Sequence, residues 1–206
     1  MGSYGIQGVP DPANQPGMRT DALSWTDPDG YLWLFGGNGT GDTNEIGYLN
    51  DLWKYNPADG NWTWMKGSSS TIDIYDTKDH SVYGSQGIPD AANTPGPRIK
   101  ASSWTDNNGD MWLFGGYSTR EPFMGDIAYY YNSLWKYDRS LGVWIWMKGS
   151  STHNMNGTYG NAGIPNAANT PGARARSHTW TDSSGALWLF GGSGYDANGE
   201  WGRLND

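Results

Sequence analysis

The sequence predicts an all-β protein built from a repeated unit of short antiparallel strands. The segment from Tyr83 to Arg98 returns almost unchanged from Tyr159 to Arg174, and a version of it opens the chain from Tyr4 to Arg19. Each copy is followed by Trp-Thr-Asp and then by Leu-Phe-Gly-Gly. Glycine makes up 31 of the 206 residues and aromatic residues 15%, a composition typical of tight hairpins and half-buried strands.

The repeat divides the chain into three units, residues 4–82, 83–158 and 159–206. Successive copies of the Pro-Gly pair lie 79 and then 76 residues apart. A long fixed period indicates a repeat architecture, in which each unit packs on its neighbours. We therefore expect one array over the whole chain, with the third unit truncated after its second strand.

Each unit is expected to begin with a hairpin. The first strand is predicted at residues 20–26, 100–105 and 175–181, and the second at 31–35, 111–114 and 186–190. The turn between them reads Asp-x-x-Gly, as in Asp27–Gly30, which suits a type I turn closed by a residue at positive φ. A Gly pair, Gly36-Gly37 in the first unit, is expected to end the second strand.

Two further strands are predicted in the first two units, at residues 51–55 and 61–65 and again at 133–137 and 143–147. The alternation places their aromatic residues on shared faces. The units differ in length in two places, and insertions collect in loops. We therefore predict loops at residues 37–52 and 116–134, and at 67–83 and 149–159. The long segment that joins successive units carries a repeated pattern, so an ordered loop is expected.

A Gly pair followed by a Tyr and a Trp that are separated by six residues resembles the kelch repeat. The marks are Gly36-Gly37 with Tyr55 and Trp62, and Gly115-Gly116 with Tyr137 and Trp144, while the third unit keeps only Gly191-Gly192. The resemblance implies kelch-type β-propeller blades of four antiparallel strands around a central channel, two complete and one incomplete. The closest type is the bacterial, galactose-oxidase-like array with long inter-blade loops. Such an array implies either a fragment of a longer propeller or a protomer that joins further copies of itself.

Composition limits the classes of partner. A net charge of −8 argues against nucleic acid, whose phosphates attract Lys and Arg. No apolar run approaches the roughly 20 residues that span a bilayer, so membrane insertion is not expected. No segment resembles a signal peptide, so we expect either that the chain is made without one or that an export signal lies outside it. We expect an extracellular or cell-surface location.

Enzymatic chemistry is not expected. The galactose-oxidase association implies a copper site built from a Cys-linked Tyr and His ligands, but the chain has no Cys, and His80, His153 and His178 fall at different phases of the repeat. The Asp-box of sialidase-like propellers needs an Asp two residues before the hairpin Gly, and those positions hold Pro28, Asn107 and Ser183. Asp73, Asp76 and Asp79 suggest a calcium site, but a solvated loop is the better interpretation. We predict no metal and no cofactor.

Candidate binding residues are Arg19, Arg98, Arg174 and Trp201. The arginines recur at the entrance of the first strand, where arginines of some kelch domains bind acidic peptides through charge-assisted pairs. Strict recurrence favours the alternative, an Arg bonded to loop carbonyls or to a neighbouring Asp in each unit. Trp201 lies outside the repeat frame and is the best candidate for an exposed aromatic residue.

Three functions follow from the sequence. The first is a non-catalytic module that binds or adheres to a protein or carbohydrate ligand. The second is a structural protein that assembles with copies of itself into a ring or filament through incomplete blades. The third is the scaffold part of a larger galactose-oxidase-like enzyme. Asn38 and Asn156 are candidate glycosylation sites, and Asn61 is a weaker one because it begins a predicted strand.

Overall fold

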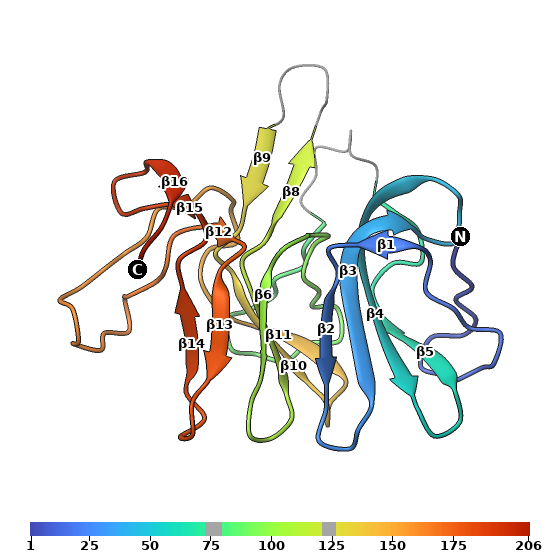
Figure 1. Cartoon of the computed structure of the whole chain (residues 1–206). Helices are drawn as coiled ribbons and strands as arrows, with labels where there is room; N and C mark the ends of the chain where they lie inside the picture. The colour runs from blue at the N-terminus through green and yellow to red at the C-terminus, as the bar shows by residue number, and fades with distance from the viewer. Residues whose placement is uncertain (73–79, 121–126) are drawn as a thin grey trace.

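The computed structural model describes residues 1–72, 80–120 and 127–206. In these ranges the chain forms sixteen strands and no helix, which confirms the all-β prediction. It follows that no described segment is a helix long and apolar enough to cross a bilayer. The strands form several antiparallel sheets that lie side by side in chain order (Figure 1).

The first unit forms the largest sheet. It consists of β1 (Arg19–Thr20), β2 (Leu23–Thr26), β3 (Leu32–Thr40), β4 (Ile46–Asn56) and β5 (Asn61–Lys66). The order is β1-β3-β4-β5, and β2 also pairs with β3. Large side chains therefore meet across strands, as where Leu34 lies opposite Trp53 and Tyr55 opposite Trp62.

The second unit forms a four-stranded sheet in the order β11-β10-β7-β6. These strands are β6 (Ser102–Thr105), β7 (Met111–Phe114), β10 (Leu134–Asp138) and β11 (Val143–Lys148). A separate hairpin of β8 (Tyr117–Arg120) and β9 (Ile127–Tyr130) lies between β7 and β10 in the chain. The four strands predicted for each of the first two units are thus present.

The third unit is smaller, and it extends further than the sequence suggests. Its strands are β12 (Arg174–Ala175), β13 (His178–Thr181), β14 (Leu187–Phe190), β15 (Ser193–Tyr195) and β16 (Trp201–Arg203). β13 pairs with β14, and β12, β15 and β16 form a separate three-stranded sheet. The predicted end after the second strand therefore omits β15 and β16.

The loops predicted at residues 37–52 and 116–134 are in large part strands, which corrects the sequence analysis. In the first unit the Gly pair bends the strand instead of ending it. Gly36 and Gly37 have φ of 65° and 102°, and the register shifts between Phe35 and Gly37. Such a bulge kinks a strand and lets it continue in a new direction. β3 therefore runs on to Thr40, and β8–β9 and β15–β16 occupy the corresponding stretches of the other units.

The predicted first strand is interrupted in each unit. Asp21, Lys100 and Arg176 have positive φ values of 57°, 53° and 61°. Residues other than glycine seldom adopt this conformation, and its recurrence at one phase of the repeat indicates a required bend. In the first and third units it separates a two-residue strand, β1 or β12, from the longer β2 or β13.

The units pack directly against one another. β2 lies beside β6, and β6 lies beside β13. A core of buried aromatic and aliphatic residues joins the first two units, with ring centroids of Trp33 and Tyr137 5.5 Å apart and those of Phe35 and Trp144 5.3 Å apart. Arg139 of the second unit also lies 3.1 Å from Asp27 of the first. Six of the thirteen Trp residues are buried, namely Trp25, Trp33, Trp53, Trp104, Trp135 and Trp144. The expectation that most Trp residues pack in the core therefore holds for just under half of them.

The long segments that open the first two units are ordered, and each packs on the sheet of its own unit. Gly8 donates its N–H to the carbonyl of Trp64, and Gly87 donates to the carbonyl of the equivalent Trp146. Each segment also closes on itself through an isolated bridge, such as Ser3 with Gln15. The entrance arginine at the end of each segment is thereby held against its own sheet.

Candidate functional site

The three entrance arginines are interior residues. Arg98 and Arg174 are 2% and 1% exposed, and the Arg19 side chain is 5% exposed. In each unit Nε donates to a glycine carbonyl two residues earlier, and Nη1 donates to the carbonyl of the first glycine of the Gly pair, over 3.0–3.2 Å. The guanidinium group thus ties the inter-unit segment to the bend after the second strand.

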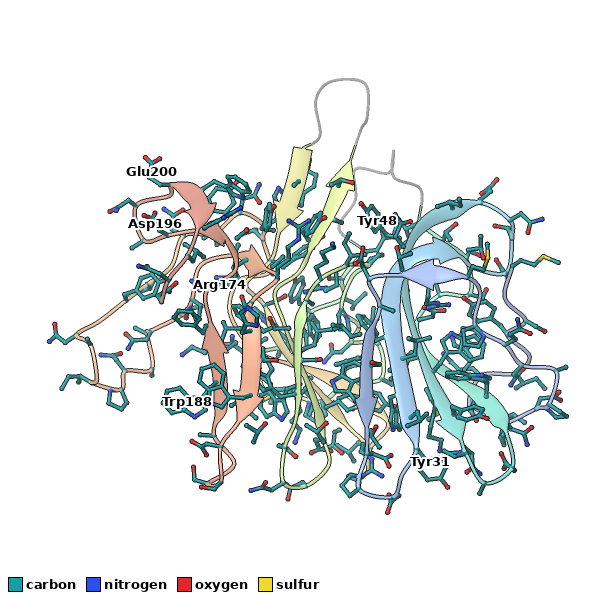
Figure 2. All side chains as sticks on the ribbon, in the orientation of Figure 1. Tyr31, Tyr48, Arg174, Trp188, Asp196 and Glu200 are labelled. Atoms are coloured by element: carbon teal, nitrogen blue, oxygen red, sulfur yellow. The ribbon has the colours of Figure 1, made fainter. Side chains whose placement is uncertain are left out.

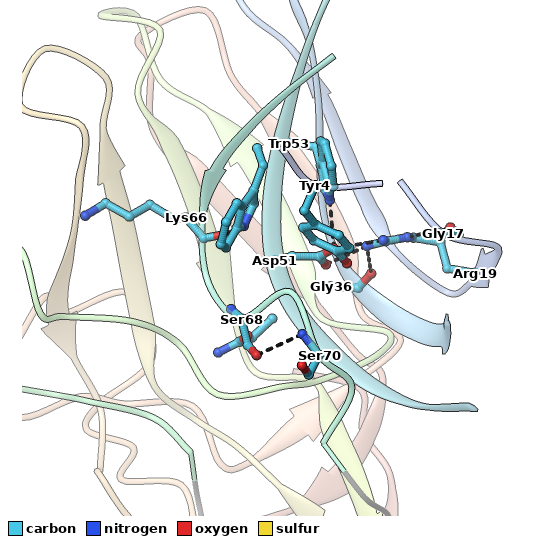
Figure 3. A network of polar contacts seen from close by, with 11 residues as sticks. Tyr4, Gly17, Arg19, Gly36, Asp51, Trp53, Lys66, Ser68 and Ser70 are labelled. Carbon is cyan, nitrogen blue, oxygen red and sulfur yellow. Dashed lines mark hydrogen bonds and ion pairs between the residues drawn. The ribbon is translucent and has the colours of Figure 1, made fainter. Parts of the chain in front are cut away.

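In the first unit the arginine forms a closed polar network (Figure 3). Arg19 donates two hydrogen bonds to the carboxylate of Asp51, at 2.6 and 2.8 Å. The same carboxylate accepts hydrogen bonds from the hydroxyl of Tyr4 at 2.6 Å and from Nε1 of Trp53 at 2.7 Å. Four donors therefore converge on one fully buried carboxylate, which satisfies them all.

This environment shifts the pKa values of the donors. Burial, together with the neighbouring Asp51 carboxylate, raises the pKa of the Tyr4 hydroxyl far above its usual range. Burial alone would lower the pKa of Arg19, but the hydrogen bonds and charge of Asp51 outweigh it and raise that pKa. Both shifts favour the protonated forms of these groups.

The third unit repeats the ion pair with a residue far along the chain. Arg174 donates to both carboxylate oxygens of Asp206 at 2.9 Å, and it donates to the hydroxyl of Tyr159 at 2.6 Å. Burial opposes ionisation of Asp206, yet the hydrogen bonds and charge of Arg174 lower its pKa. Tyr4 with Asp51 and Tyr159 with Asp206 are thus equivalent sets.

The second unit departs from this pattern, because Ser133 takes the place of the aspartate. Arg98 donates to the Ser133 hydroxyl at 3.2 Å, and Nε1 of Trp135 donates to the same oxygen at 3.1 Å. The Arg98 guanidinium lies 4.3 Å from the ring centroid of Tyr131. Among the residues that the structure describes, no carboxylate lies within ion-pair distance of Arg98. The hydroxyl of Tyr83 is buried and has no hydrogen-bond partner there.

Burial and internal bonding favour the structural interpretation of Arg19, Arg98 and Arg174. Their guanidinium groups do not reach a surface where an acidic peptide would meet them. They connect the long segment, the bend and the third-strand position of one unit.

A second carboxylate recurs in each unit, in the first hairpin. The sequence predicted its place in the turn but not its bond to a tryptophan. Oδ1 of Asp27 accepts backbone N–H bonds within the first hairpin, and Oδ2 accepts the indole N–H of Trp33 at 2.8 Å. Asp106 with Trp112 and Asp182 with Trp188 repeat the arrangement. The aspartate lies three residues before the hairpin glycine, whereas the search for an Asp-box placed it two before. The spacing Asp-x-x-Gly-x-x-Trp was the available signal.

Trp201 is exposed, as predicted, and it belongs to a cluster that the sequence did not reveal. It is 57% exposed on β16, and its ring lies 6.2 Å from that of the buried Tyr130. Tyr117 stacks on Tyr130 at 5.3 Å, and the guanidinium of Arg176 lies 5.6 Å from the Tyr117 ring. We call Tyr117, Tyr130, Arg176, Tyr195 and Trp201 the aromatic rim. It is built from β8, β9, β15 and β16, which lie together at the top of Figure 1.

The outer face of β13 and β14 carries an exposed aromatic surface. Trp180, Trp188 and Phe190 are each 48% exposed, and the two indole rings stack at 5.8 Å. Figure 2 labels Trp188 on this face. The equivalent residues of the first unit are buried against the second unit: Trp25, Trp33 and Phe35. We call Trp180, Trp188 and Phe190 the outer aromatic face.

The candidate glycosylation sites differ in access. Asn156 is exposed. Asn38 lies within β3, paired with both β1 and β4, and its side-chain oxygen is buried. Asn61 begins β5 and is half-buried. Of the three, Asn156 is the position with room for a glycan.

The described ranges hold no group of three or more His, Cys, Asp or Glu residues arranged to bind a metal ion. His153 packs edge-on against Tyr129 at 4.0 Å, and His178 lies on β13. The aspartates considered for calcium, Asp73, Asp76 and Asp79, lie outside the described residues.

No protein-family model matches the chain, and no curated protein matches it. A search of solved structures finds similarity to the structure of YjhT, with a TM-score of 0.49 and 16% sequence identity. The match covers 94% of this chain and 53% of that one, so the chain spans about half the length of that protein. A likeness at this level leaves the function to be argued from the residues of the chain itself.

Proposed function

We propose that the chain is a non-catalytic, kelch-type β-propeller module that binds a protein or carbohydrate ligand outside the cell or at its surface. The observation that carries the proposal is the aromatic rim, in which the exposed ring of Trp201 lies 6.2 Å from that of the buried Tyr130. Tyr130 in turn stacks on Tyr117, and the guanidinium of Arg176 lies over the Tyr117 ring. The five-stranded and four-stranded antiparallel sheets of the first two units, and the adjacency of β2, β6 and β13, support the blade interpretation.

The chemistry of the rim suits this role. An exposed indole ring offers a flat apolar face for a sugar ring or for an apolar peptide side chain, and Tyr and Arg add hydrogen-bond donors at its edge. Trp, Tyr and Arg are also the residues that most often dominate binding energy at interfaces. Because Tyr130 is itself buried, it holds the rim in place beneath Trp201.

Glycan and peptide arrays probed with the purified chain would test the proposal. We expect Trp201→Ala to weaken binding of any recovered ligand by tenfold or more, a loss of about 1.4 kcal/mol. Trp180→Ala is the matched control, since it removes an exposed Trp from the outer aromatic face. Binding that survives Trp201→Ala and Arg176→Ala unchanged would contradict a site at the rim.

A second candidate function is assembly, and the outer aromatic face favours it. The first two units bury Trp33 and Phe35 against Tyr137 and Trp144. In the first unit, which has no described unit on its far side, Tyr55 and Trp62 correspond to Tyr137 and Trp144, yet they are only half-buried. The contact between the first two units is therefore a template for head-to-tail packing of a further unit or copy.

Sedimentation over a range of concentrations tests assembly apart from ligand binding. We expect self-association that Trp188→Ser abolishes and Trp201→Ala leaves intact. A folded chain that stays monomeric at high concentration would contradict assembly through the outer aromatic face. A scaffold role in a larger galactose-oxidase-like enzyme stays a prediction.

A further inference from the structure

We propose that the second unit binds a small monovalent anion, chloride in the simplest case, in the space where the first unit places the Asp51 carboxylate. The binding groups are Arg98, Tyr83 and Ser133, and the indole of Trp135 donates to the Ser133 oxygen. The proposal is independent of the rim and of assembly, because it concerns a site inside one unit.

Arg98 carries a buried positive charge. Arg98 is 2% exposed, and no described carboxylate pairs with it. A guanidinium group does not lose its proton under conditions in which proteins fold, and an unpaired buried charge is costly. The Tyr131 ring at 4.3 Å attracts the cation. A ring face is a weaker partner than the bidentate carboxylate that Arg19 and Arg174 each have.

The second unit also holds hydrogen-bond donors that lack a close acceptor. In the first unit the arginine, the Tyr4 hydroxyl and the Trp53 indole all donate to one carboxylate. The second unit keeps every one of these donor types. The Tyr83 hydroxyl, however, has no partner among the described residues, and Nη2 of Arg98 makes only a long contact of 3.5 Å with the Ser81 hydroxyl. These groups are left facing a position that holds a carboxylate in the other two units.

Size and the number of donors limit the ligand. Ser has one carbon and one oxygen fewer than Asp, so the Ser133 side chain takes less room than that of Asp51, and its hydroxyl can donate to an anion. The proposed ion is therefore no larger than a small anion such as chloride. A single positive charge with two neutral donors, the Tyr83 and Ser133 hydroxyls, favours a monovalent anion, and burial of Arg98 and Ser133 disfavours a larger one.

Thermal unfolding in sodium chloride and in sodium gluconate at equal ionic strength tests the proposal. Gluconate is too large for the site, so we expect Tm to rise saturably with chloride, by about 5 °C at a hundredfold excess over Kd. Ser133→Asp supplies the missing carboxylate and should remove the chloride dependence. Ser151→Asp adds the same charge on an exposed loop residue and should keep it. Asp51→Ser should create a second chloride response in the first unit.

A direct measurement keeps the proposal falsifiable if a variant fails to fold. The linewidth of ³⁵Cl NMR should broaden in the presence of the wild-type protein, and formate should reverse the broadening if it competes for the same site. Wild-type protein that shows no saturable chloride effect and no broadening would overturn the proposal, and water would then fill the space. A chloride response that Ser133→Asp retains would overturn it as well.

Discussion

The first and second units hold an equivalent arginine in the same place, but the two buried networks differ in net charge. Around Arg19 a buried carboxylate neutralises the cation and accepts every neighbouring donor. Around Arg98 the scaffold and donors are the same, but the acceptor is a neutral serine. The repeat therefore preserves the geometry of the network while one position decides its net charge.

A second difference accompanies the first. The residue two positions before the acceptor is Leu49 in the first unit and Tyr131 in the second, and both are buried. The tyrosine ring lies beneath the Arg98 guanidinium. Loss of the carboxylate thus coincides with gain of an aromatic face that attracts a cation. The second unit therefore differs from the first at two neighbouring positions, Ser133 for Asp51 and Tyr131 for Leu49.

Removing the acceptor of each network should change the stability of the two units by very different amounts. Asp51→Ala leaves the Arg19 charge and the Tyr4 hydroxyl buried without a partner, so we expect a loss of about 3–5 kcal/mol in the free energy of unfolding. Ser133→Ala removes a neutral acceptor from a network that already lacks its carboxylate, and we expect a loss of about 1 kcal/mol. Urea unfolding of both variants measures the difference. Equal losses would show that the Asp51 pair contributes no more than a neutral hydrogen bond.

Sequence reasoning found the arginines but not their partners. The structural interpretation, an Arg bonded to carbonyls or to an Asp, is what the contacts favour. The partner was missed because it lies 32 residues further along in the first and third units, and 35 residues further in the second. The equal spacing of Arg19 to Asp51 and Arg174 to Asp206 was a usable signal, hidden because the second unit has a longer insertion and a serine.

The fold class and the first two sets of four strands were predictable because hairpin turns and alternating aromatic residues are local patterns. The strands beyond each Gly pair were not. Two glycines end a strand as readily as they bend it, and only the partner strand decides which occurs. The aromatic rim was missed for the same reason, since β8, β9, β15 and β16 lie in stretches read as loops or left without a strand assignment.

The third unit has a titratable acceptor, Asp206, where the second unit has a serine, so its stability should depend on pH. Arg174 lowers the pKa of Asp206, so the folded state favours the ionised carboxylate. The ion pair therefore contributes its full stability above the ordinary aspartate pKa of about 3.9 and loses it as pH falls through the lowered value. We expect wild type to exceed Asp206→Asn in stability at pH 7 and the difference to shrink toward pH 2. Urea unfolding across this range measures it, and a constant difference would contradict the assignment.

The tyrosines at the end of each network are expected to differ in the same sense as the acceptors, and Tyr83→Phe has the smallest expected effect. Tyr4→Phe removes a hydrogen bond to a buried carboxylate, so we expect a loss of about 1.5–3 kcal/mol. The Tyr83 hydroxyl has no described partner, so in gluconate Tyr83→Phe should change stability by less than about 0.5 kcal/mol.

In chloride the same Tyr83→Phe variant should lose more stability than in gluconate, because the hydroxyl then donates to the bound anion. Unfolding of wild type and variant in the two salts separates the cases. Identical small changes in both salts would place the anion out of reach of Tyr83 and leave Arg98 and Ser133 to hold it. A large loss in gluconate would show that the hydroxyl has a protein partner.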